Sequence, residues 1–217
     1  MDLRGYYDSV LGMWVRVSMA RLAQSRPALF LDRDGVIVEE TDYLCRAADT
    51  RLISGAAEVI AAANAARIPV IELTNQAGIG RGYYGWNEFL EVEGEIARLL
   101  ALHDAHIDAT YACPFHSTGK EPYLHPAHPA RKPQPGMLLE AARGLNLDLS
   151  RSWIVGDHAS DMLAGSNAGL AGGIHVLTGH GPEERPKLPS PIGLDLRLGN
   201  SIRDATPLVA TLAVTGV

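Results

Sequence analysis

The chain has 217 residues, which fits one domain or one domain with an insertion, and its 47% hydrophobic content is enough for a sizeable core. Its formal net charge of -6, with no basic run longer than two residues, argues against nucleic acid as a partner. Two cysteines, a start unlike a leader peptide and no apolar segment near the roughly 20 residues of a membrane span predict a cytoplasmic protein without membrane attachment.

An apolar run from Ala28 to Leu31 predicts a buried strand, which ends abruptly in the sequence Asp32-Arg33-Asp34-Gly35. Two carboxylates so close to the end of a buried strand are costly unless a cation or hydrogen bonds compensate them. A surface turn is the simpler interpretation, because Asp and Gly are common in turns. Polar residues follow other expected strands in the same way, and this pattern favours a functional site.

Strands and helices alternate along the rest of the chain. Further strands are expected at 70–73, 109–112, 152–155, 173–177 and 194–198, and helices at about 56–63, 86–103, 137–145 and 201–212. Another helix is expected after the polar stretch 156–162, ending at about Ala168. This alternation predicts an α/β fold, a Rossmann-like three-layer sandwich with a central parallel sheet. We assign it to residues 27–217, with a Pro- and His-rich loop at 113–135. We interpret residues 1–26 as an N-terminal extension that Trp14, Tyr6 and Tyr7 tether to the domain surface.

Three of the expected strands end in polar clusters, and a fourth cluster precedes a helix. These clusters are Asp32 with Asp34, Thr74 with Asn75, Asp157 with Asp161, and Arg131-Lys132-Pro133. A parallel sheet places the carboxyl ends of its strands at one edge, where ligands bind in open α/β sheets. We therefore expect the four clusters to meet.

The chemistry available to these side chains suits phosphoryl transfer to water. Asp32, Asp34 and Asp157 form a hard, oxygen-rich site of the kind that Mg²⁺ prefers. A carboxylate such as Asp32 can attack phosphorus, and Asp34 can act as general acid and then base. Thr74 offers a hydroxyl to a phosphoryl oxygen, and Lys132 a positive charge to the transition state.

The order of these motifs resembles that of the haloacid dehalogenase (HAD) superfamily of phosphatases. The matching strings are Leu31-Asp-Arg-Asp-Gly35, Thr74-Asn-Gln-Ala-Gly-Ile-Gly-Arg-Gly82, Arg131-Lys-Pro-Gln-Pro-Gly136 and Val155-Gly-Asp157 with Asp161-Met162. Together they are similar to the capless subgroup that contains heptose bisphosphate phosphatases and histidinol phosphatases. The match covers roughly residues 27 to 180.

The resemblance implies a role for each matched residue. Asp32 is the nucleophile and a Mg²⁺ ligand, Asp34 is the acid/base with its backbone carbonyl on the metal, and Asp157 is the acidic Mg²⁺ ligand. Thr74 and Lys132 stabilise the phosphoryl group. Positions that contact substrate in the family correspond to Glu40, Thr41, Asp42, Tyr43, Asn75, Gln76, Ala77 and Arg131.

His158 departs from the heptose bisphosphatase pattern, which has Lys after the metal-binding Asp. We place His158 among the substrate-binding residues, where its partial charge near neutrality would make phosphate recognition pH-dependent. Asp161 has two interpretations, a helix N-terminal carboxylate, which we favour, and a direct metal ligand. We interpret Arg81 as a loop residue or structural ion pair, and Cys45 as a bystander.

The loop at 113–135 contains six of the thirteen prolines. Members of the family often bind structural Zn²⁺ here, but in that register the chain offers Cys113, Phe115, His128 and Ala130, two of which are not ligands. Another set, Cys113, His116, His125 and His128, has spacings that Zn²⁺ accepts. We expect proline stiffness and packing to hold the loop, with structural Zn²⁺ possible but not favoured.

The combined interpretation is a Mg²⁺-dependent, capless HAD-like phosphatase acting through an aspartyl phosphate on a small phosphorylated metabolite. The expected substrate is a phosphorylated sugar similar to heptose 1,7-bisphosphate, with histidinol phosphate as the alternative. A polynucleotide 3′-phosphatase has similar motifs, but the acidic balance disfavours it. A non-catalytic binding module with the same fold is the alternative from another class. We expect a monomer or a weak homo-oligomer.

Overall fold

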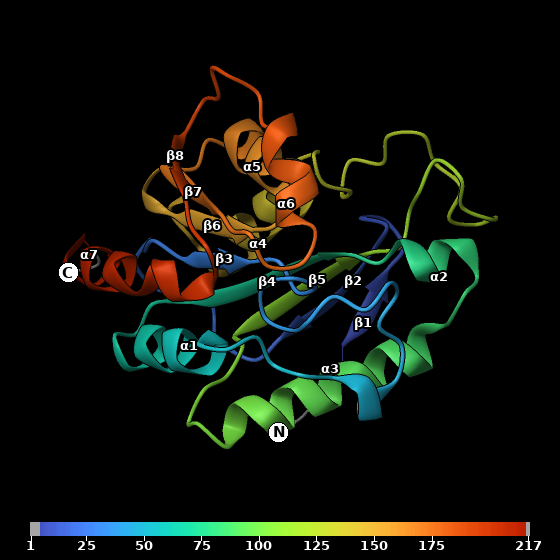
Figure 1. The fold of residues 1–217 in the computed structure, drawn as a ribbon, viewed down its shortest axis with the longest axis horizontal. Coiled ribbons are helices and arrows are strands. Elements are labelled where there is room, and N and C mark those ends of the chain that lie inside the picture. The colour runs from blue at the N-terminus through green and yellow to red at the C-terminus, as the bar shows by residue number, and fades with distance from the viewer. Residues whose placement is uncertain (1–4, 216–217) are drawn as a thin grey trace.

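The computed structural model describes residues 5–215, and its central element is an eight-stranded sheet (Figure 1). Its strands are β1 (Tyr6–Asp8), β2 (Met13–Val17), β3 (Leu29–Leu31), β4 (Val70–Asn75), β5 (Ala109–Cys113), β6 (Trp153–Gly156), β7 (Gly172–His175) and β8 (Asp195–Leu198). They lie in the order β1-β2-β5-β4-β3-β6-β7-β8, and those from β5 to β8 run parallel. The predicted α/β fold with a central parallel sheet is confirmed.

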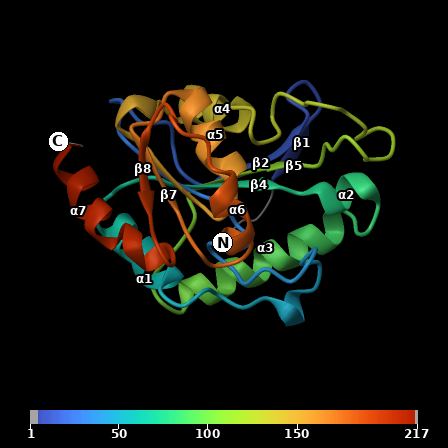
Figure 2. The ribbon, with the colours of Figure 1, turned by 45° about the horizontal axis from the view of Figure 1, so that its top comes forward.

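Helices cover both faces of the sheet and complete the three layers (Figure 2). They are α1 (Ala56–Ala65), α2 (Ala77–Arg81), α3 (Trp86–Ala101), α4 (Gly136–Leu145), α5 (Ala159–Ala168), α6 (Gly181–Glu184) and α7 (Thr206–Thr215). The core on one face includes α1, α3 and α7, and the core on the other includes α4 and α5. Within residues 5–215, none of the helices combines the length and apolar content that crossing a membrane requires.

Strand β3 shows how the apolar run seen in the sequence builds both cores. Leu29 and Leu31 pack into the core beneath α1 and α3, while Phe30 packs into the core beneath α4 and α5. Successive side chains of a strand point to opposite faces, so a strand covered on both faces needs apolar residues at every position. This requirement accounts for the unbroken run before Asp32.

The N-terminal segment differs from the expected surface extension. Met13–Val17 pairs antiparallel with β5, and β1 pairs with the outer side of β2. Trp14 is buried, with its ring centroid 5.2 Å from that of Phe89 on α3. The expectation that residues 1–26 only lie on the domain surface is therefore wrong for these strands. Arg16 breaks the apolar run and hides the strand in the sequence, yet it too is buried and donates to Thr110 Oγ1 at 2.8 Å.

Parallel pairing fixes the place of the site. The pairing of β3 with both β4 and β6 aligns Leu31 with Glu72 and with Val155, so the residues that follow each strand emerge at one edge. Asp32, Thr74 and Asp157 lie at or just beyond those carboxyl ends.

Candidate active site

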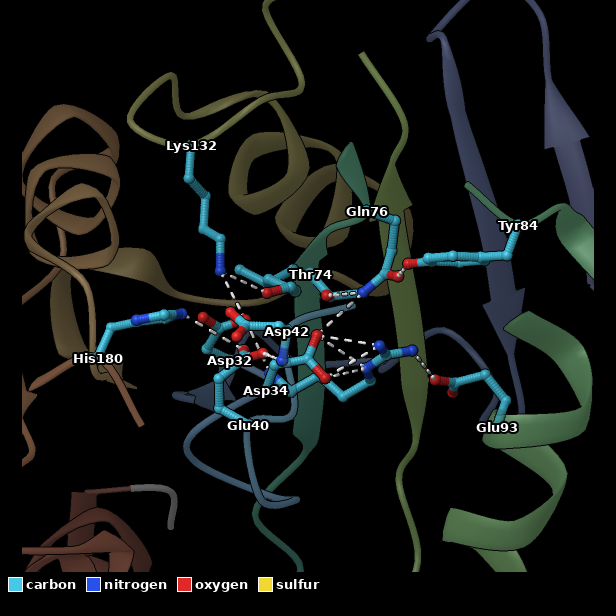
Figure 3. A network of polar contacts seen from close by, with 12 residues as sticks. Asp32, Asp34, Glu40, Asp42, Thr74, Gln76, Tyr84, Glu93, Lys132 and His180 are labelled. Carbon is cyan, nitrogen blue, oxygen red and sulfur yellow. Dashed lines mark hydrogen bonds and ion pairs between the residues drawn. The ribbon is translucent and has the colours of Figure 1, made fainter. Parts of the chain in front are cut away.

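A cavity of about 540 Å³ opens at the carboxyl edge of the parallel strands. Figure 3 shows Lys132 pointing toward Asp32 and Thr74 in contact with Gln76, with Glu40 and His180 on the opposite side of the carboxylates from Gln76. The lining consists of Asp32, Arg33, Asp34, Glu40, Asp42, Tyr43, Leu44, Thr74, Asn75, Gln76, Ala77, Gly78, Tyr84, Arg131, Lys132, Pro133, His158, Ser160 and His180. Three of the four expected polar clusters therefore line one cavity, and the fourth, Asp157 with Asp161, is buried beside Asp32.

Three buried carboxylates gather at the bottom of the cavity. Oxygens of Asp32, Asp157 and Asp161 lie within 4.8 Å of one another. The Nζ atom of Lys132 is 2.8 Å from Asp32 Oδ1 and 2.6 Å from Asp161 Oδ1, and it donates to the carbonyl of Leu73 at 2.8 Å. Although burial acts against it, the carboxylates of Asp161 and Asp32 raise the pKa of Lys132, so this ammonium stays charged.

One ammonium beside three carboxylates leaves the cluster short of positive charge. Burial, followed by the charges of Asp32 and Asp161, raises the pKa of Asp157 to about 9, and burial also raises the pKa of Asp32. Asp157 Oδ1 is buried and has no hydrogen-bond partner among the described residues. A hard oxygen donor set with excess negative charge and an unpaired oxygen fits Mg²⁺.

Two glycines let the backbone approach Asp157 closely. A Cβ atom on Gly35 would lie 2.3 Å from Asp157 Oδ2, and one on Gly179 would lie 2.2 Å from the same atom. Both glycines have positive φ angles, 81° and 58°, which residues other than glycine rarely adopt. His180 then donates its backbone N–H to Asp157 Oδ2 at 2.7 Å, which fixes that oxygen and leaves Oδ1 toward the cluster.

Asp34 is held from the side of β4 by an amide. Gln76 Nε2 lies 3.1 Å from Asp34 Oδ2 and 2.7 Å from Thr74 Oγ1, so one amide links the two side chains. The Tyr84 hydroxyl donates to Gln76 Oε1 and sets the orientation of that amide. The remaining contacts of Asp34 are to the guanidinium of Arg33, which lies beneath the cavity.

A side-chain clamp fixes the backbone that carries Lys132. Asn75 Oδ1 accepts from the backbone N–H of Lys132, and Asn75 Nδ2 donates to its carbonyl, both at 3.1 Å. The amide thus pairs with Lys132 as a neighbouring strand would. Asn75 lines the cavity, but these two bonds occupy its polar atoms.

Comparison with known proteins agrees with this geometry. The family described as HAD-hydrolase-like matches residues 129–199. A D-glycero-beta-D-manno-heptose-1,7-bisphosphate 7-phosphatase of Mesorhizobium japonicum is 48% identical over 163 residues, 75% of each chain. The enzyme of that name from Pasteurella multocida is 37% identical over 154 residues, 71% of this chain and 83% of the relative.

The chain belongs to the D-glycero-D-manno-heptose-1,7-bisphosphate 7-phosphatase family of HAD-like hydrolases.

Solved structures agree on the fold of this family. A crystal structure from Mesorhizobium loti, assigned as a HAD-like phosphatase, superposes with a TM-score of 0.85 at 40% identity, over 97% of this chain and 98% of that one. The D,D-heptose 1,7-bisphosphate phosphatase of B. bronchiseptica, solved with magnesium and phosphate, gives a TM-score of 0.75 at 26% identity, over 85% of this chain and 98% of that one. The resemblance found in the motifs is confirmed.

Most residues expected to contact substrate in this family line the cavity. These are Glu40, Asp42, Tyr43, Asn75, Gln76, Ala77, Arg131 and His158. Thr41 instead lines a neighbouring hollow, together with Glu40 and Asp42. Asp161 Oδ2 accepts the N–H of His158 at the start of α5 at 3.0 Å, as expected for a helix N-terminal carboxylate, and Oδ1 faces Lys132. A direct role of Asp161 as a metal ligand stays a prediction. Arg81 contacts the Tyr43 hydroxyl and His116, as a residue that joins loops would.

Other residues of the cavity escaped the sequence analysis, namely Arg33, Tyr84, Ser160 and His180. His180 is 3.8 Å from Glu40 Oε2, and its ring centroid lies 4.9 Å from that of His158. A signal for His180 existed, because Thr178-Gly179-His180 follows β7 at the same edge as the other clusters. No comparable pattern marks Tyr84, since its place depends on the course of the chain between α2 and α3.

The Pro- and His-rich loop is held by ring contacts in the structure. His128 stacks on Phe115 with centroids 3.8 Å apart and planes at 3°. Cys113 is buried at the end of β5, and burial raises the pKa of its thiol to about 11, which opposes the thiolate that Zn²⁺ requires. His116 turns toward Arg81 and Thr118. Neither group of potential metal ligands among the described residues includes these side chains, and we still expect elemental analysis to find no Zn²⁺.

Proposed function

We propose that this protein is a Mg²⁺-dependent phosphatase that removes the C7 phosphate of a D-glycero-D-manno-heptose 1,7-bisphosphate. The observation that carries the proposal is Lys132 bridging Asp32 and Asp161 beside Asp157, at the bottom of an open cavity. The relative that is 48% identical has this activity in its name, and so does the relative from Pasteurella multocida.

The side chains divide the reaction between them. Asp32 attacks the phosphorus, the bond between phosphorus and the sugar oxygen breaks, and Asp34 gives a proton to the departing oxygen. Water then attacks the aspartyl phosphate, Asp34 takes the proton of that water, and phosphate leaves. Lys132 and the Thr74 hydroxyl stabilise the charge that builds on the phosphoryl oxygens. Bound Mg²⁺, held by Asp32, Asp157 and the carbonyl of Asp34, adds positive charge at the same oxygens.

The test is hydrolysis by the purified protein of both anomers of the bisphosphate, with phosphate release and the remaining monophosphate identified by ³¹P NMR. The Mesorhizobium japonicum relative is named for the β anomer, whereas a Burkholderia mallei relative at 41% identity is named for the α anomer. We expect the β anomer to have the higher kcat/KM. Release of the C1 phosphate, or no turnover of either anomer, would contradict the proposal.

Histidinol phosphate is the control substrate in the same assay, and we expect it to be a poor one. A non-catalytic binding protein would release no phosphate from any substrate, including an activated aryl phosphate. We also propose that the protein acts in the cytoplasm as a monomer or weak homo-oligomer. Cell fractionation and light scattering test these two points.

A further inference from the structure

A buried guanidinium lies directly beneath the catalytic carboxylates. Arg33 stands between Asp32 and Asp34 in the sequence, and its side chain is 1% exposed. Its Nε and Nη2 atoms lie 3.0 to 3.2 Å from the two carboxylate oxygens of Asp34. Each of the two nitrogens therefore contacts both carboxylate oxygens, and these charge-assisted contacts hold the carboxylate in place. So deeply buried a guanidinium acts on the reaction through Asp34.

The far side of Arg33 contacts helix α3. Its Nη1 atom is 3.4 Å from Glu93 Oε1, and its Cζ lies 5.5 Å from the centroid of the Phe89 ring. Figure 3 shows Glu93 reaching from α3 toward the site. The contacts of Glu93 and Asp34 use different nitrogens of the same guanidinium. A change in the contact between Glu93 and Arg33 therefore changes the position of the guanidinium that contacts Asp34.

Glu93 itself belongs to a buried cluster that lies away from the cavity. Glu93, Glu72 on β4 and Arg16 on β2 line one small void of about 10 Å³, and all three are buried. Burial and then the neighbouring Glu93 raise the pKa of Glu72 well above its usual range, and burial also raises the pKa of Glu93, against the opposing charges of Arg33 and Arg16. Arg16 and Arg33 are the cations that lie beside these two carboxyl groups.

Packing alone does not explain this cluster. Apolar residues of similar volume fill such a space at no loss of stability, and often with a gain, compared with buried ion pairs. The cluster would therefore serve to orient Asp34, because a guanidinium fixed by Glu93 holds the Asp34 side chain in one rotamer. Without the contact to Glu93, the guanidinium and the Asp34 side chain would change rotamer together.

We propose that Glu93 is a positioning residue for Asp34, acting through the guanidinium of Arg33. The proposal rests on the proposed function only in taking Asp34 as the proton donor to the leaving group. Loss of the anchor misplaces that donor and leaves Asp32, Lys132 and the metal ligands in place. The defect should therefore depend on how much the leaving group needs a proton.

Glu93→Gln is the test variant, compared on an alkyl phosphate and on 2,4-dinitrophenyl phosphate, whose leaving group departs without protonation. Correctly placed general acids contribute about 10² to 10⁴ in rate, so we expect the variant to lose about 10- to 100-fold in kcat/KM for the alkyl phosphate. For the dinitrophenyl ester we expect a loss within about twofold, because kcat/KM reports the first step, in which no proton is required. Glu95→Gln, on the same helix and paired with Arg98, is the matched control and should match wild type on both substrates.

A double-mutant cycle with Arg33→Gln shows whether Glu93 acts through Arg33. We expect Glu93→Gln to have no further effect on the alkyl phosphate once Arg33 is replaced, since the two changes break the same connection. Glu93→Asp, which keeps the charge but withdraws it by one methylene, should give an intermediate loss, and it carries the test if Glu93→Gln does not fold. Equal losses on both substrates, or additive losses in the double variant, would overturn the proposal.

The wild-type assays separate this proposal from that of the substrate. If the heptose bisphosphate is not hydrolysed but another alkyl phosphate is, the substrate assignment fails and the Glu93 test proceeds with that ester. If no alkyl phosphate is hydrolysed, Asp34 has no leaving group to protonate and both proposals fall.

Discussion

At the scale of single residues, the contact between Asp32 and Lys132 joins the proposed nucleophile to the cation proposed to stabilise the phosphoryl group. The two side chains are buried and 2.8 Å apart, so the carboxylate is held in place and the ammonium stays charged. Lys132 in turn is placed by Asp161 and the Leu73 carbonyl. Asn has the same shape as Asp, so Asp32→Asn removes the charge of the nucleophile, while the contacts of Lys132 with Asp161 and the Leu73 carbonyl do not involve the replaced side chain.

The first prediction is that Asp32→Asn loses at least about 10³-fold in kcat, because an amide is a very poor nucleophile toward phosphorus. The variant should fold, as circular dichroism and a thermal melt would check. Steady-state phosphate release measures the effect, and mass spectrometry after rapid quenching should detect a phosphorylated Asp32 in wild type only. Turnover near that of wild type in a verified variant would exclude the aspartyl phosphate.

Sequence reasoning reached Asp32, Asp34, Thr74, Lys132 and Asp157 because each follows an apolar run or precedes a helix in a recognisable string. It missed the part played by Arg33, although that residue lies inside the first string. Nothing local indicates whether an arginine between two aspartates points to solvent or inward. Its direction depends on Glu93, sixty residues further along the chain.

At the scale of elements, the turns after β3 and β7 close on Asp157, the carboxylate that we propose as a Mg²⁺ ligand. Gly35 and Gly179 come together over Asp157, and the Thr178 hydroxyl donates to the Gly35 carbonyl at 2.6 Å. This contact joins two loops that the sequence separates by more than a hundred residues. A side chain at either glycine would force them apart.

The second prediction is that Gly179→Ala weakens Mg²⁺ binding at least about tenfold and lowers activity in proportion at limiting Mg²⁺, because a shifted carboxylate ligand loses its geometry. Gly169→Ala is the matched control, since Gly169 has a similar positive φ of 79° and nothing lies within 4 Å of the place that a Cβ atom would take there. It should lose about 1 kcal/mol of unfolding free energy and retain its Mg²⁺ affinity. Mg²⁺ titrations of activity and urea unfolding measure the two effects, and equal Mg²⁺ affinity in both variants would contradict the prediction.

The third prediction concerns β2. Trp14→Ala should lower the free energy of unfolding by about 3 to 5 kcal/mol, because it removes a buried indole that packs on Phe89. Tyr6→Ala, on the outer strand and 60% exposed, should change it by about 0.5 kcal/mol or less. Chemical denaturation gives both values. A small effect of Trp14→Ala would mean that β2 contributes little to the sheet in solution.

Element boundaries could be predicted best where apolar runs or helical spacing were unbroken, as at β3, β4 and α3. The edge strand β2 could not, because a buried arginine interrupts its apolar pattern and its partner β5 lies about a hundred residues away. Short helices such as α2 and α6, of five and four residues, have too few positions to show a period.

At the scale of the whole molecule, binding of Mg²⁺ should couple to stability. The fourth prediction is that Mg²⁺ at about a hundred times its Kd adds about 2.7 kcal/mol to the unfolding free energy, since the unfolded chain has no assembled site. For a chain of this size that corresponds to a rise in Tm of roughly 5 to 10 °C.

Differential scanning calorimetry with and without EDTA measures the shift, with NaCl at equal ionic strength as the control. Asp157→Asn should abolish the Mg²⁺-dependent part, because it removes a ligand whose charge the cation would balance. EDTA should also stop turnover, and added Mg²⁺ should restore it. A shift that NaCl reproduces, or that persists in Asp157→Asn, would place the effect elsewhere.

The clamp between Asn75 and the backbone of Lys132 separates the position of the lysine from the long excursion before it. Because the side chain of Asn75, at the end of β4, bonds the backbone of Lys132, the residues between Pro114 and Pro129 need not hold Lys132 in place. We therefore expect that stretch to tolerate changes in length and composition that leave Lys132 in place. Exchanging this loop between homologues would then be a way to change substrate preference without altering the side chains proposed for catalysis.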